Sequence, residues 1–401
     1  MNAFVAIRPI RDYCLGIYDG PHATPHDAEH GPIFLGIKNI TDDGQLDFSE
    51  IRHVSEDEFP KWTRRVVPGP GDVVFTYEAT LHRYALIPDG FRGCLGRRVA
   101  LIRPNPLFAD SRYLLYYFLS PAWRSVVESN VMSGATVDRI PLERFPTFPV
   151  ALPSIAIQRA VGDLLSTYDD LIENNRRRMA LLEESARLLY REWFVRLRFP
   201  GYEHTPVVGG VPQGWERKTL GDLCSEVRDM VLPETLEPDT PYIGLEHIPR
   251  RSISLNEWGT VEQVTSSKSR FKMGEIIFGK IRPYFHKVGV AFVDGVASSD
   301  SIVVRPANDK LHGLVLMTMS SDEFVAVTAQ QMKEGSKMPR ADWKQMKAYR
   351  VPVPPSGLLS NFDGVIQPIV EQLKSISLAS QKLRTARDLL LPRLMSGELA
   401  V

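Results

Sequence analysis

The sequence contains little cysteine, no long apolar run and no excess of either charge. Its three cysteines, Cys14, Cys94 and Cys224, are odd in number, lie far apart and form no CxxC pair. This argues for a reducing compartment and against a disulfide framework or a cysteine zinc site. No apolar run approaches the roughly 18 residues of a membrane span, and the N-terminal MNAFVAIRPIRD is too short an apolar stretch for a secretory signal. We therefore expect a soluble, cytoplasmic protein.

The absence of net charge bears on possible partners. Lys+Arg and Asp+Glu both number 48, whereas an isolated nucleic-acid-binding domain is usually basic. The hydrophobic fraction of 43% is ordinary for globular proteins, and 401 residues predict two or three domains.

Motifs of common enzyme classes are also missing. The sequence has no G-x-S-x-G, no GxGxxG and no Asp/Asn-Pro-Pro-aromatic motif. GEIIFGKI resembles a phosphate-binding loop, but Ile281 stands where Ser or Thr must bind magnesium, and the segment overlaps an apparent strand. A nuclease-like set can be assembled from Asp322, Asp342 and Lys344, but so loose a pattern occurs in most chains of this length. We expect a protein that is not an enzyme.

The spacing of three histidines near the N-terminus raises the question of a metal site. His22, His26 and His30 are four residues apart, as metal ligands on a helix would be. Pro21, Pro25 and a following glycine interrupt any such helix, so we interpret this segment as a polar loop and expect no bound metal.

Two long amphipathic helices dominate what is present. Residues 153–200 have no interior proline, and apolar residues recur at steps of four and three, apart from two fours in a row across Asn175, which indicates a stutter. Ser154 is an expected N-cap, and Pro200-Gly201 an expected stop. At about 1.5 Å per residue, the span from Ile157 to Trp193 is roughly 55 Å long.

The same pattern returns at the C-terminus. Apolar residues recur from Phe362 to Leu394, and we expect Pro368 to end a short lead-in and to open the long helix, with Gly397 just past its end. Each helix has one apolar seam that needs a partner, so the two most simply pack on each other. Parallel and antiparallel pairing are both sterically possible, and two ordinary core helices of a large α/β protein are the alternative. The expected seam residues are Ile157, Val161, Leu164, Tyr168, Leu171, Leu182, Leu189, Ile369, Leu373, Ile376, Leu383 and Leu390.

The two halves of the chain repeat each other. At an offset of 202 residues, Arg103-Pro104 matches Arg305-Pro306, and four leucines of the first long helix match leucines of the second. GDVVF at residues 71–75 resembles GEIIF at 274–278. The common order of these weak matches indicates a tandem duplication of a mixed α/β domain followed by a long helix.

Short β-branched runs predict the strands of each globular domain. The predicted strands are residues 31–40, 72–77, 98–103, 241–248, 275–278 and 301–305. The predicted short helices are residues 113–119, 122–130, 314–319 and 322–332. The Gly/Pro-rich segment 199–215 is a domain boundary.

Basic and polar residues are dense in the loops of both halves. Residues 250–287 carry eight Lys/Arg against three Glu, residues 83–103 carry five Arg against one Asp, and residues 333–347 carry five Lys/Arg against two acids. Such side chains neutralise phosphates and recognise base edges. Solvated loop charge is the alternative, but recurrence in both halves favours DNA. The Arg-rich face of the first long helix is instead expected to be solvated or to bind protein.

Two similar domains on a rod of roughly 55 Å would span more than one turn of B-DNA, about 34 Å. Because the loops of the halves differ, such a protein would recognise two different, separated half-sites.

Nearly the whole chain resembles the specificity (S) subunit of type I restriction–modification systems, and we describe it as HsdS-like, with two target recognition domains. The resemblance rests on DGPHATP, FLGIKNI and the segment from Ala151 to Phe194 in the first half, and on GWERKTLGDL, GSKMPR and LRTARDLLLPRLMSGEL in the second. No Trp-containing opening like residues 214–223 precedes Asp19, so the first domain looks trimmed.

The resemblance implies a fold, a function and partners. The fold is α/β, with mixed α+β target recognition domains in tandem at 1–152 and 201–357, separated by long helices at 153–200 and 358–401 that form an antiparallel coiled coil and act as a spacer ruler. The chain would be a non-catalytic subunit that binds double-stranded DNA, two modification subunits and restriction subunits. It would hold no cofactor, while S-adenosylmethionine, ATP and Mg are expected on the partners. A self-contained DNA nuclease and a coiled-coil assembly scaffold are the alternatives.

Loop position and donor type select the residues expected to contact DNA. They are His22, Thr24, His26, Arg83, Thr136 and Arg139 in the first half, and Lys268, Arg270, Arg282, His286, Lys337 and Arg340 in the second.

Overall fold

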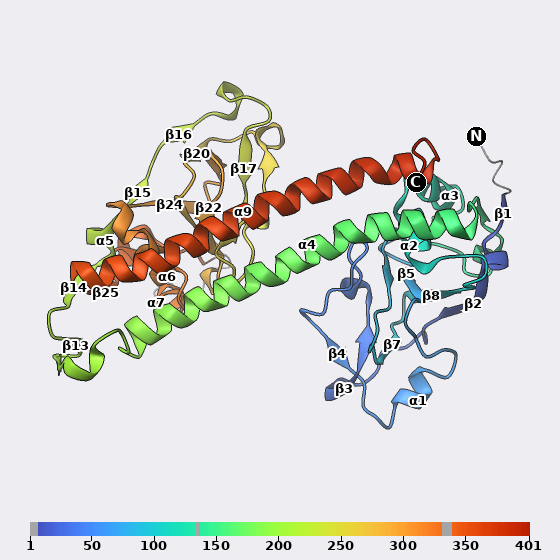
Figure 1. Cartoon of the computed structure of the whole chain (residues 1–401), viewed down its shortest axis with the longest axis horizontal. Coiled ribbons are helices and arrows are strands. Elements are labelled where there is room, and N and C mark those ends of the chain that lie inside the picture. The colour runs from blue at the N-terminus through green and yellow to red at the C-terminus, as the bar shows by residue number, and fades with distance from the viewer. Residues whose placement is uncertain (1–6, 134–136, 331–338) are drawn as a thin grey trace. The chain divides into compact units, whose positions relative to one another are not determined.

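The computed structural model describes residues 7–133, 137–330 and 339–401 (Figure 1). Its contacts divide the chain into two compact units, Met1–Leu171 with Leu383–Val401 (unit 1), and Ile172–Lys382 (unit 2). The long helices α4 (Ile155–Tyr190) and α9 (Ser356–Met395) each contribute a segment to both units. The domain boundaries at 152/153, 200/201 and 357/358 divide the chain by sequence order, whereas the two units are defined by contacts. These boundaries stay predictions.

Unit 1 is built on two small sheets. The first has the order β2 (Cys14–Asp19), β8 (Val99–Pro104), β5 (Val73–Thr76) and β6 (Tyr84–Leu86), with antiparallel neighbours. The second has the order β4 (Arg52–His53), β3 (Ala28–Leu35) and β7 (Gly93–Leu95), with β3 and β7 parallel. The remaining elements are α1 (Phe59–Trp62), α2 (Ser111–Leu119), α3 (Pro121–Glu128) and the short strand pairs β1 (Arg8–Pro9) with β11 (Pro149–Val150) and β9 (Met132–Ser133) with β10 (Asp138–Arg139).

The core of unit 1 lies between the first sheet and its helices. α3 begins where the Ser120 hydroxyl caps the Trp123 amide, with proline at the first helical position. Trp123 is fully buried and donates its indole N–H to the Tyr84 hydroxyl at 3.0 Å. The same cluster includes Val161 and Leu165 of α4 and Leu394 of α9, so the helix segments of unit 1 share the core of its globular part.

Unit 2 repeats this plan with larger sheets. The first has the order β15 (Cys224–Val227), β24 (Ser301–Pro306), β21 (Ile276–Gly279), β22 (Val288–Ala291) and β18 (Ser254–Leu255). The second has the order β16 (Met230–Val231), β20 (Lys268–Phe271), β23 (Gly295–Ala297), β17 (Pro241–Ile243) and β19 (Gly259–Thr260). The other elements are β12 (Val207–Val208), β13 (Val211–Pro212), β14 (Glu216–Thr219), β25 (Arg350–Val353), α5 (Leu220–Leu223), α6 (His312–Met319), α7 (Asp322–Gln330) and α8 (Trp343–Met346).

Strand register aligns the two units residue by residue. In unit 1 the central strand β5 lies between β8 and β6, and in unit 2 β21 lies between β24 and β22. At the start of these strands a buried carboxylate pairs with an arginine, Asp72 with Arg103 at 2.7 Å and Glu275 with Arg305 at 2.5 Å. The predicted match of Arg103-Pro104 with Arg305-Pro306 therefore marks corresponding positions in space.

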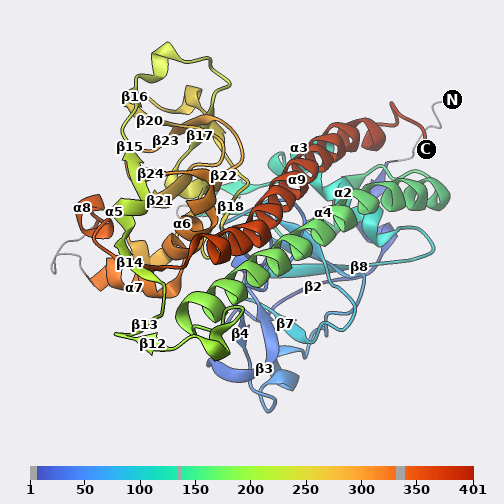
Figure 2. The same cartoon turned by 60° about the vertical axis from the view of Figure 1, so that its left-hand side comes forward.

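The long helices pack antiparallel within each unit, as Figures 1 and 2 show. In unit 2, the Phe194 and Phe362 ring centroids are 4.8 Å apart, while Asn175 Nδ2 donates to Ser380 Oγ at 3.1 Å. Residue numbers thus rise along α4 as they fall along α9. α4 ends in a π-helical turn, Arg191–Val195, before the predicted stop.

The predicted seam residues are not equally buried. Val161, Leu373 and Ile376 are buried, whereas Ile157 and Leu171 are 43% and 46% exposed. The other predicted seam residues are half-buried: Leu164, Tyr168, Leu182, Leu189, Ile369, Leu383 and Leu390.

A buried glutamine explains the exposure of Ile157. Gln158 takes the interior position, and its amide is satisfied by the Asp110 N–H at 2.9 Å and by the carbonyls of Phe108 and Pro153. A polar side chain can occupy this place because every hydrogen-bonding group it buries has a partner. The buried face of α4 at this end therefore lies one residue away from the position that the apolar pattern predicts.

The predicted break at Pro368 is absent, because α9 is one helix through this residue. An interior proline removes one backbone hydrogen bond. Phe362, Ile366, Val370 and Leu373 are buried on both sides of it, so packing holds the helix together across the proline.

Candidate nucleic-acid interface

Unit 1 has a basic hollow of about 480 Å³ at the edge where its two sheets meet. Five cationic side chains line it, together with uncharged groups that include Thr24 and Phe34. The cations are Lys38, Arg52, Arg83, Arg97 and Arg98. We call this site the basic hollow.

Four of the five cations of the basic hollow are held by the protein itself. Lys38 pairs with Glu50 at 3.0 Å, and Arg98 pairs with Glu78 at 2.9 Å. Arg52 pairs with Asp27 at 2.5 Å and lies over the Phe34 ring, and Arg83 donates to the Ile40 carbonyl at 3.2 Å. Within the described part of the chain, no hydrogen bond or ion pair engages the exposed side chain of Arg97.

The loop that carries Arg97 is fixed by its backbone. It joins β7 to β8 and therefore links the two sheets, with the Gly96 amide bonded to the Leu35 carbonyl at 2.8 Å and the Val99 amide bonded to the Gly96 carbonyl at 3.1 Å. A Cβ on Gly20 would lie 2.3 Å from the Gly96 carbonyl oxygen, so this approach requires glycine. Arg97 extends from a rigid turn.

The corresponding loop of unit 2 has different chemistry. It joins β23 to β24, and the register places Ser299 and Asp300 where unit 1 has Arg97 and Arg98. Asp300 pairs with Arg340 at 3.1 Å. The sheet-linking loop therefore supplies the arginine of its ion pair in unit 1 and the carboxylate in unit 2, and the partners, Glu78 and Arg340, come from different segments.

Two predicted DNA contacts, Arg139 and Arg340, occupy corresponding positions. Arg139 forms a backbone bridge with Glu78, and Arg340 forms one with Ile281, each just past the end of the central strand. Both arginines are exposed. The structure thus places two residues chosen independently at one site of the repeated domain.

The other unit 1 candidates differ in their surroundings. Thr24 is exposed at the basic hollow. The exposed His22 contacts Asp19 at 3.0 Å, and the side chain of His26 is also exposed. Thr136, like Lys337 of the second half, lies outside the described residues.

In unit 2, Lys268 and His286 require correction. Lys268 is buried, donates to the Ser266 carbonyl and hydroxyl at 2.7 Å each, and burial lowers its pKa. His286 is buried, with Nε2 2.7 Å from the Ser320 carbonyl. Both have polar atoms engaged inside the protein, so they are unsuited to contact DNA as they stand. Arg270 and Arg282 are exposed.

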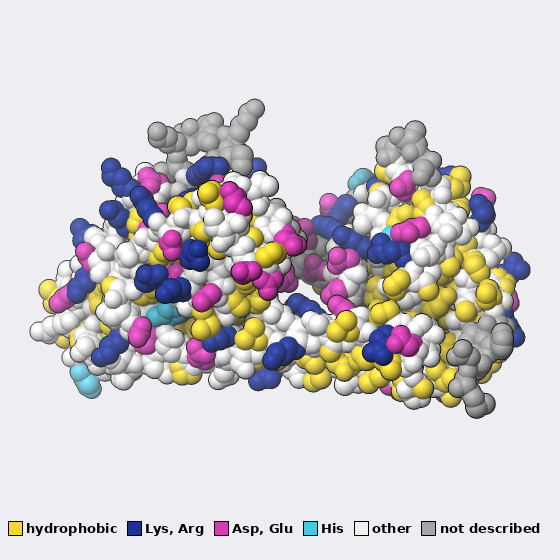
Figure 3. All heavy atoms as spheres, turned by 90° about the horizontal axis from the view of Figure 1, so that it is seen from above, with side chains coloured by type: hydrophobic (Ala, Val, Ile, Leu, Met, Phe, Trp, Pro, Cys, Tyr) yellow, Lys and Arg dark blue, Asp and Glu magenta, His cyan; other side chains and the backbone are white. Residues whose placement is uncertain are grey.

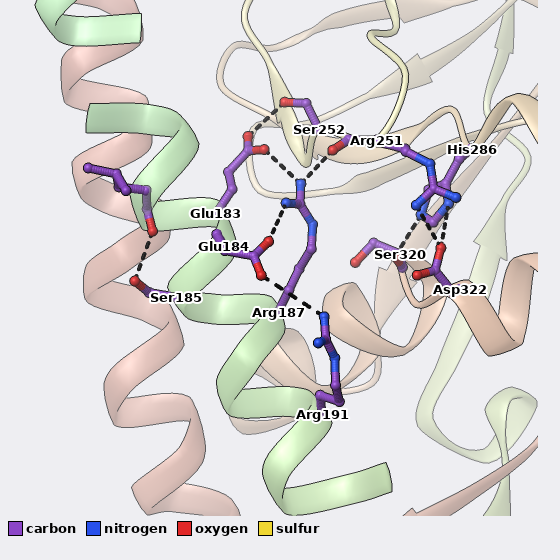
Figure 4. Close-up of polar contacts among 11 residues, drawn as sticks. Glu183, Glu184, Ser185, Arg187, Arg191, Arg251, Ser252, His286, Ser320 and Asp322 are labelled. Carbon is purple, nitrogen blue, oxygen red and sulfur yellow. Dashed lines mark hydrogen bonds and ion pairs between the residues drawn. The ribbon is translucent and has the colours of Figure 1, made fainter. Parts of the chain in front are cut away.

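His286 belongs to a polar network that binds α4 to the globular part of unit 2 (Figure 4). Buried Glu183 accepts hydrogen bonds from Ser252 and Ser254 at 2.7 and 2.6 Å, and it pairs with Arg187 at 3.0 Å. Arg187 also pairs with Glu184, and Arg251 pairs with Asp322 beside His286. Much of the Arg-rich face of α4 is therefore used in intramolecular pairs.

Side chains of both charges lie on the face that Figure 3 displays. Figure 3 shows Lys/Arg and Asp/Glu side chains interspersed on the face that it displays, in keeping with the zero net charge. Within residues 7–133, 137–330 and 339–401, no group of three or more His, Cys, Asp or Glu side chains is arranged to hold a metal ion. Nor does any helix of these ranges have the length and apolarity that crossing a membrane requires.

Comparisons with known proteins find consistent likenesses. Residues 212–384 match the family model described as the type I restriction modification DNA specificity domain. The MjaIX specificity subunit of a Methanocaldococcus jannaschii type I restriction enzyme is 23% identical over 98% of this chain and 89% of its own length. The EcoDI specificity subunit of Escherichia coli is 22% identical over 63% of this chain and 61% of its own.

A solved structure agrees in fold. The crystal structure of a type I restriction–modification S subunit from M. genitalium aligns over 98% of this chain and 97% of that one, with a TM-score of 0.57 and 14% identity. The chain is HsdS-like.

Sequence reasoning missed part of the basic hollow. Arg97 and Arg98 were visible only as members of an arginine-rich segment, and nothing in the sequence distinguished the unpaired arginine from the paired one. The exchange of Arg97-Arg98 for Ser299-Asp300 becomes visible only after strand register aligns the halves. Aligning GDVVF with GEIIF and continuing to the next strand could have found it.

Proposed function

We propose that this chain is the DNA sequence-specificity subunit of a type I restriction–modification complex. It recognises a bipartite, asymmetric target, with one globular domain on each half-site and the helix pair setting the spacer. It is not itself catalytic, and directs adenine methylation or cleavage by its partners. The observation that carries the proposal is the duplicated domain, whose framework is the same in both units while its surface loops differ.

The partners follow from the same proposal. Two modification subunits bind S-adenosylmethionine and methylate adenine, and restriction subunits use ATP and Mg to translocate and cleave DNA. The zero net charge is consistent with partners that supply many of the phosphate contacts, because an isolated DNA-binding subunit needs its own excess of cations.

The test is to produce the chain together with its modification subunits and to map methylated adenines by sequencing. We expect one split motif with a fixed spacer and two different halves. A contiguous motif, or methylation without a motif, would overturn the proposal. The salt dependence of DNA binding, measured with and without the modification subunits, tests whether those subunits supply many of the phosphate contacts. If the affinity of the chain alone fell steeply with salt concentration, the chain itself would make most of these contacts.

The same preparation separates the alternatives. A self-contained nuclease would cleave DNA with a divalent metal in the absence of partners. A coiled-coil scaffold would bind its partners with equal affinity whether or not specific DNA is present.

A further inference from the structure

We infer that Arg97 is a specificity-determining residue that recognises a guanine in the half-site bound by unit 1. This inference rests on the proposed function and assigns a base to one position of its target.

The first step is the availability of the side chain. Arg97 is exposed in the basic hollow, whereas the hollow's other four cations have protein partners at 2.5 to 3.2 Å. Carboxylates neutralise the charges of Lys38, Arg52 and Arg98, and a backbone carbonyl holds Arg83. Arg97 alone among them keeps its guanidinium fork open for a ligand, within the described residues.

The second step is preorganisation. The Arg97 backbone lies in the turn from Gly96 to Val99, which is bonded to Leu35 and packed against Gly20. A rigid turn lowers the entropy lost when its side chain binds, and it fixes the direction of approach. The hollow that Arg97 lines has a volume of about 480 Å³.

The third step distinguishes bases from phosphates. Phosphates are alike in both half-sites, so residues that bind them can be alike in both units, as Arg139 and Arg340 are. Base-contacting residues must differ where the half-sites differ, and the structure has Arg97 where unit 2 has Ser299. An arginine fork matches the O6 and N7 acceptors of guanine in the major groove. The geometry therefore points to guanine.

The experiment uses the complex of the full chain with its modification subunits. The variants are Arg97→Ala and Arg97→Lys, and Arg92→Ala is the control, because Arg92 is an exposed arginine of the same unit that is paired with Glu56. The measurements are the methylation motif across a genome and binding to oligonucleotides with each base substituted in turn.

We expect Arg97→Ala to lower discrimination at one G·C pair of one half-site by roughly 10- to 100-fold, and to leave the other half-site unchanged. Arg97→Lys keeps the charge and loses the bidentate fork, so the salt slope should persist while guanine discrimination falls. Arg92→Ala should leave the motif unchanged.

Each contrary result is informative. Equal weakening on all sequences would make Arg97 a phosphate contact and overturn the inference, as would relaxation at an A·T pair or an unaltered split motif. A wild-type motif that is not split would instead overturn the proposed function. Circular dichroism of each variant excludes misfolding, and Arg97→Lys retains the test if the alanine variant is unstable.

Discussion

Unit 1 and unit 2 share a framework and differ at its margins. In both units, a buried carboxylate just before the central strand pairs with an arginine of the neighbouring strand. The pairs are Asp72 with Arg103 and Glu275 with Arg305. Unit 2 adds the edge strand β18 beside β22, and the four-stranded sheet of unit 1 ends at the corresponding β6. The interior of a duplicated domain is constrained by packing, while its edges and loops are open to new contacts.

The attachment to α4 also differs between the units. In unit 1, Asp169 accepts from Tyr116 at 2.5 Å and pairs with Arg387 of α9 at 2.6 Å. In unit 2, Glu183 is bonded to the serines at the start of β18. A carboxylate on α4 serves each unit, half-buried Asp169 in unit 1 and buried Glu183 in unit 2, but its partners come from different elements. The presence of β18 accounts for the difference, because that strand supplies the hydroxyls in unit 2.

We expect the largest loss of stability when the Asp169 carboxylate of unit 1 is removed. Asp169→Ala leaves Arg387 without its partner, in a pair whose side chains are 12% and 13% exposed. Breaking a buried pair costs about 3–5 kcal/mol, and the neighbouring Asp388 moves the expectation toward the lower value. Urea unfolding followed by hydrogen exchange on unit 1 peptides measures the loss.

The matched control is Asp163→Ala. Asp163 pairs with Arg112 on the exposed side of α4, and such pairs contribute about 0–1 kcal/mol. If both variants lose the same small amount, the buried pair does not attach α4 to unit 1. Protection of unit 2 peptides should be unchanged in both.

A single glycine should sharpen the difference at the sheet edge. Gly289 of β22 corresponds to Ala85 of β6, and a Cβ on Gly289 would lie 2.6 Å from the Ile253 carbonyl oxygen next to β18. We expect Gly289→Ala to destabilise unit 2 by about 1–3 kcal/mol, because the neighbouring strand must move. Ala85→Gly should cost unit 1 about 1–2 kcal/mol, from backbone entropy and from the loss of a buried methyl group.

Hydrogen exchange of the peptides that contain β18 and β22 gives the measurement. An unchanged exchange rate in Gly289→Ala would show that β18 does not depend on close approach to β22.

The sequence predicted the framework better than its margins. The predicted strands at 72–77 and 301–305 became β5 and β24 to within a residue or two, because short runs rich in β-branched apolar residues define them locally. β18 is two residues long, and its stability depends on tertiary contacts with β22 and Glu183, so local pattern could not indicate it. The seam was displaced near Gln158 for the same reason, since a buried amide is tolerated only through distant partners.

The candidate site shows a similar limit. Residue type and loop position selected Arg83, Arg139 and Arg340, whose contact with DNA stays a prediction, but could not indicate which cations are already paired. His286 was chosen as a possible base donor, and its ring is instead used to bond Ser320. Pairing and burial arise from strand register, which joins residues far apart in the chain.

We expect the smallest effect from two corresponding histidines, His82 and His286. Each lies just before corresponding strands, β6 and β22, and has a left-handed backbone conformation, with φ of 62° and 55°. Burial lowers the pKa of both. Arg124 also lowers the pKa of His82 while Glu128 opposes this. For His286, the Ser320 carbonyl and Asp322 oppose burial, and Arg251 and Arg187 reinforce it. In the folded protein each histidine therefore stays neutral at a pH at which the same histidine of the unfolded chain begins to bind a proton.

The sign of the pH dependence follows. As pH falls through the unfolded value of about 6.5, the unfolded chain takes up the proton first, so the free energy of unfolding decreases until the pH reaches the lower folded pKa. His82→Asn and His286→Asn keep a residue that tolerates a left-handed conformation and remove this titration. We expect each variant to flatten the fall in stability between pH 7 and 5 in its own unit only, measured by urea unfolding with unit-resolved hydrogen exchange. The exposed His204→Asn is the control, and an unaltered slope in His286→Asn would mean that the buried ring does not couple protonation to unfolding of unit 2.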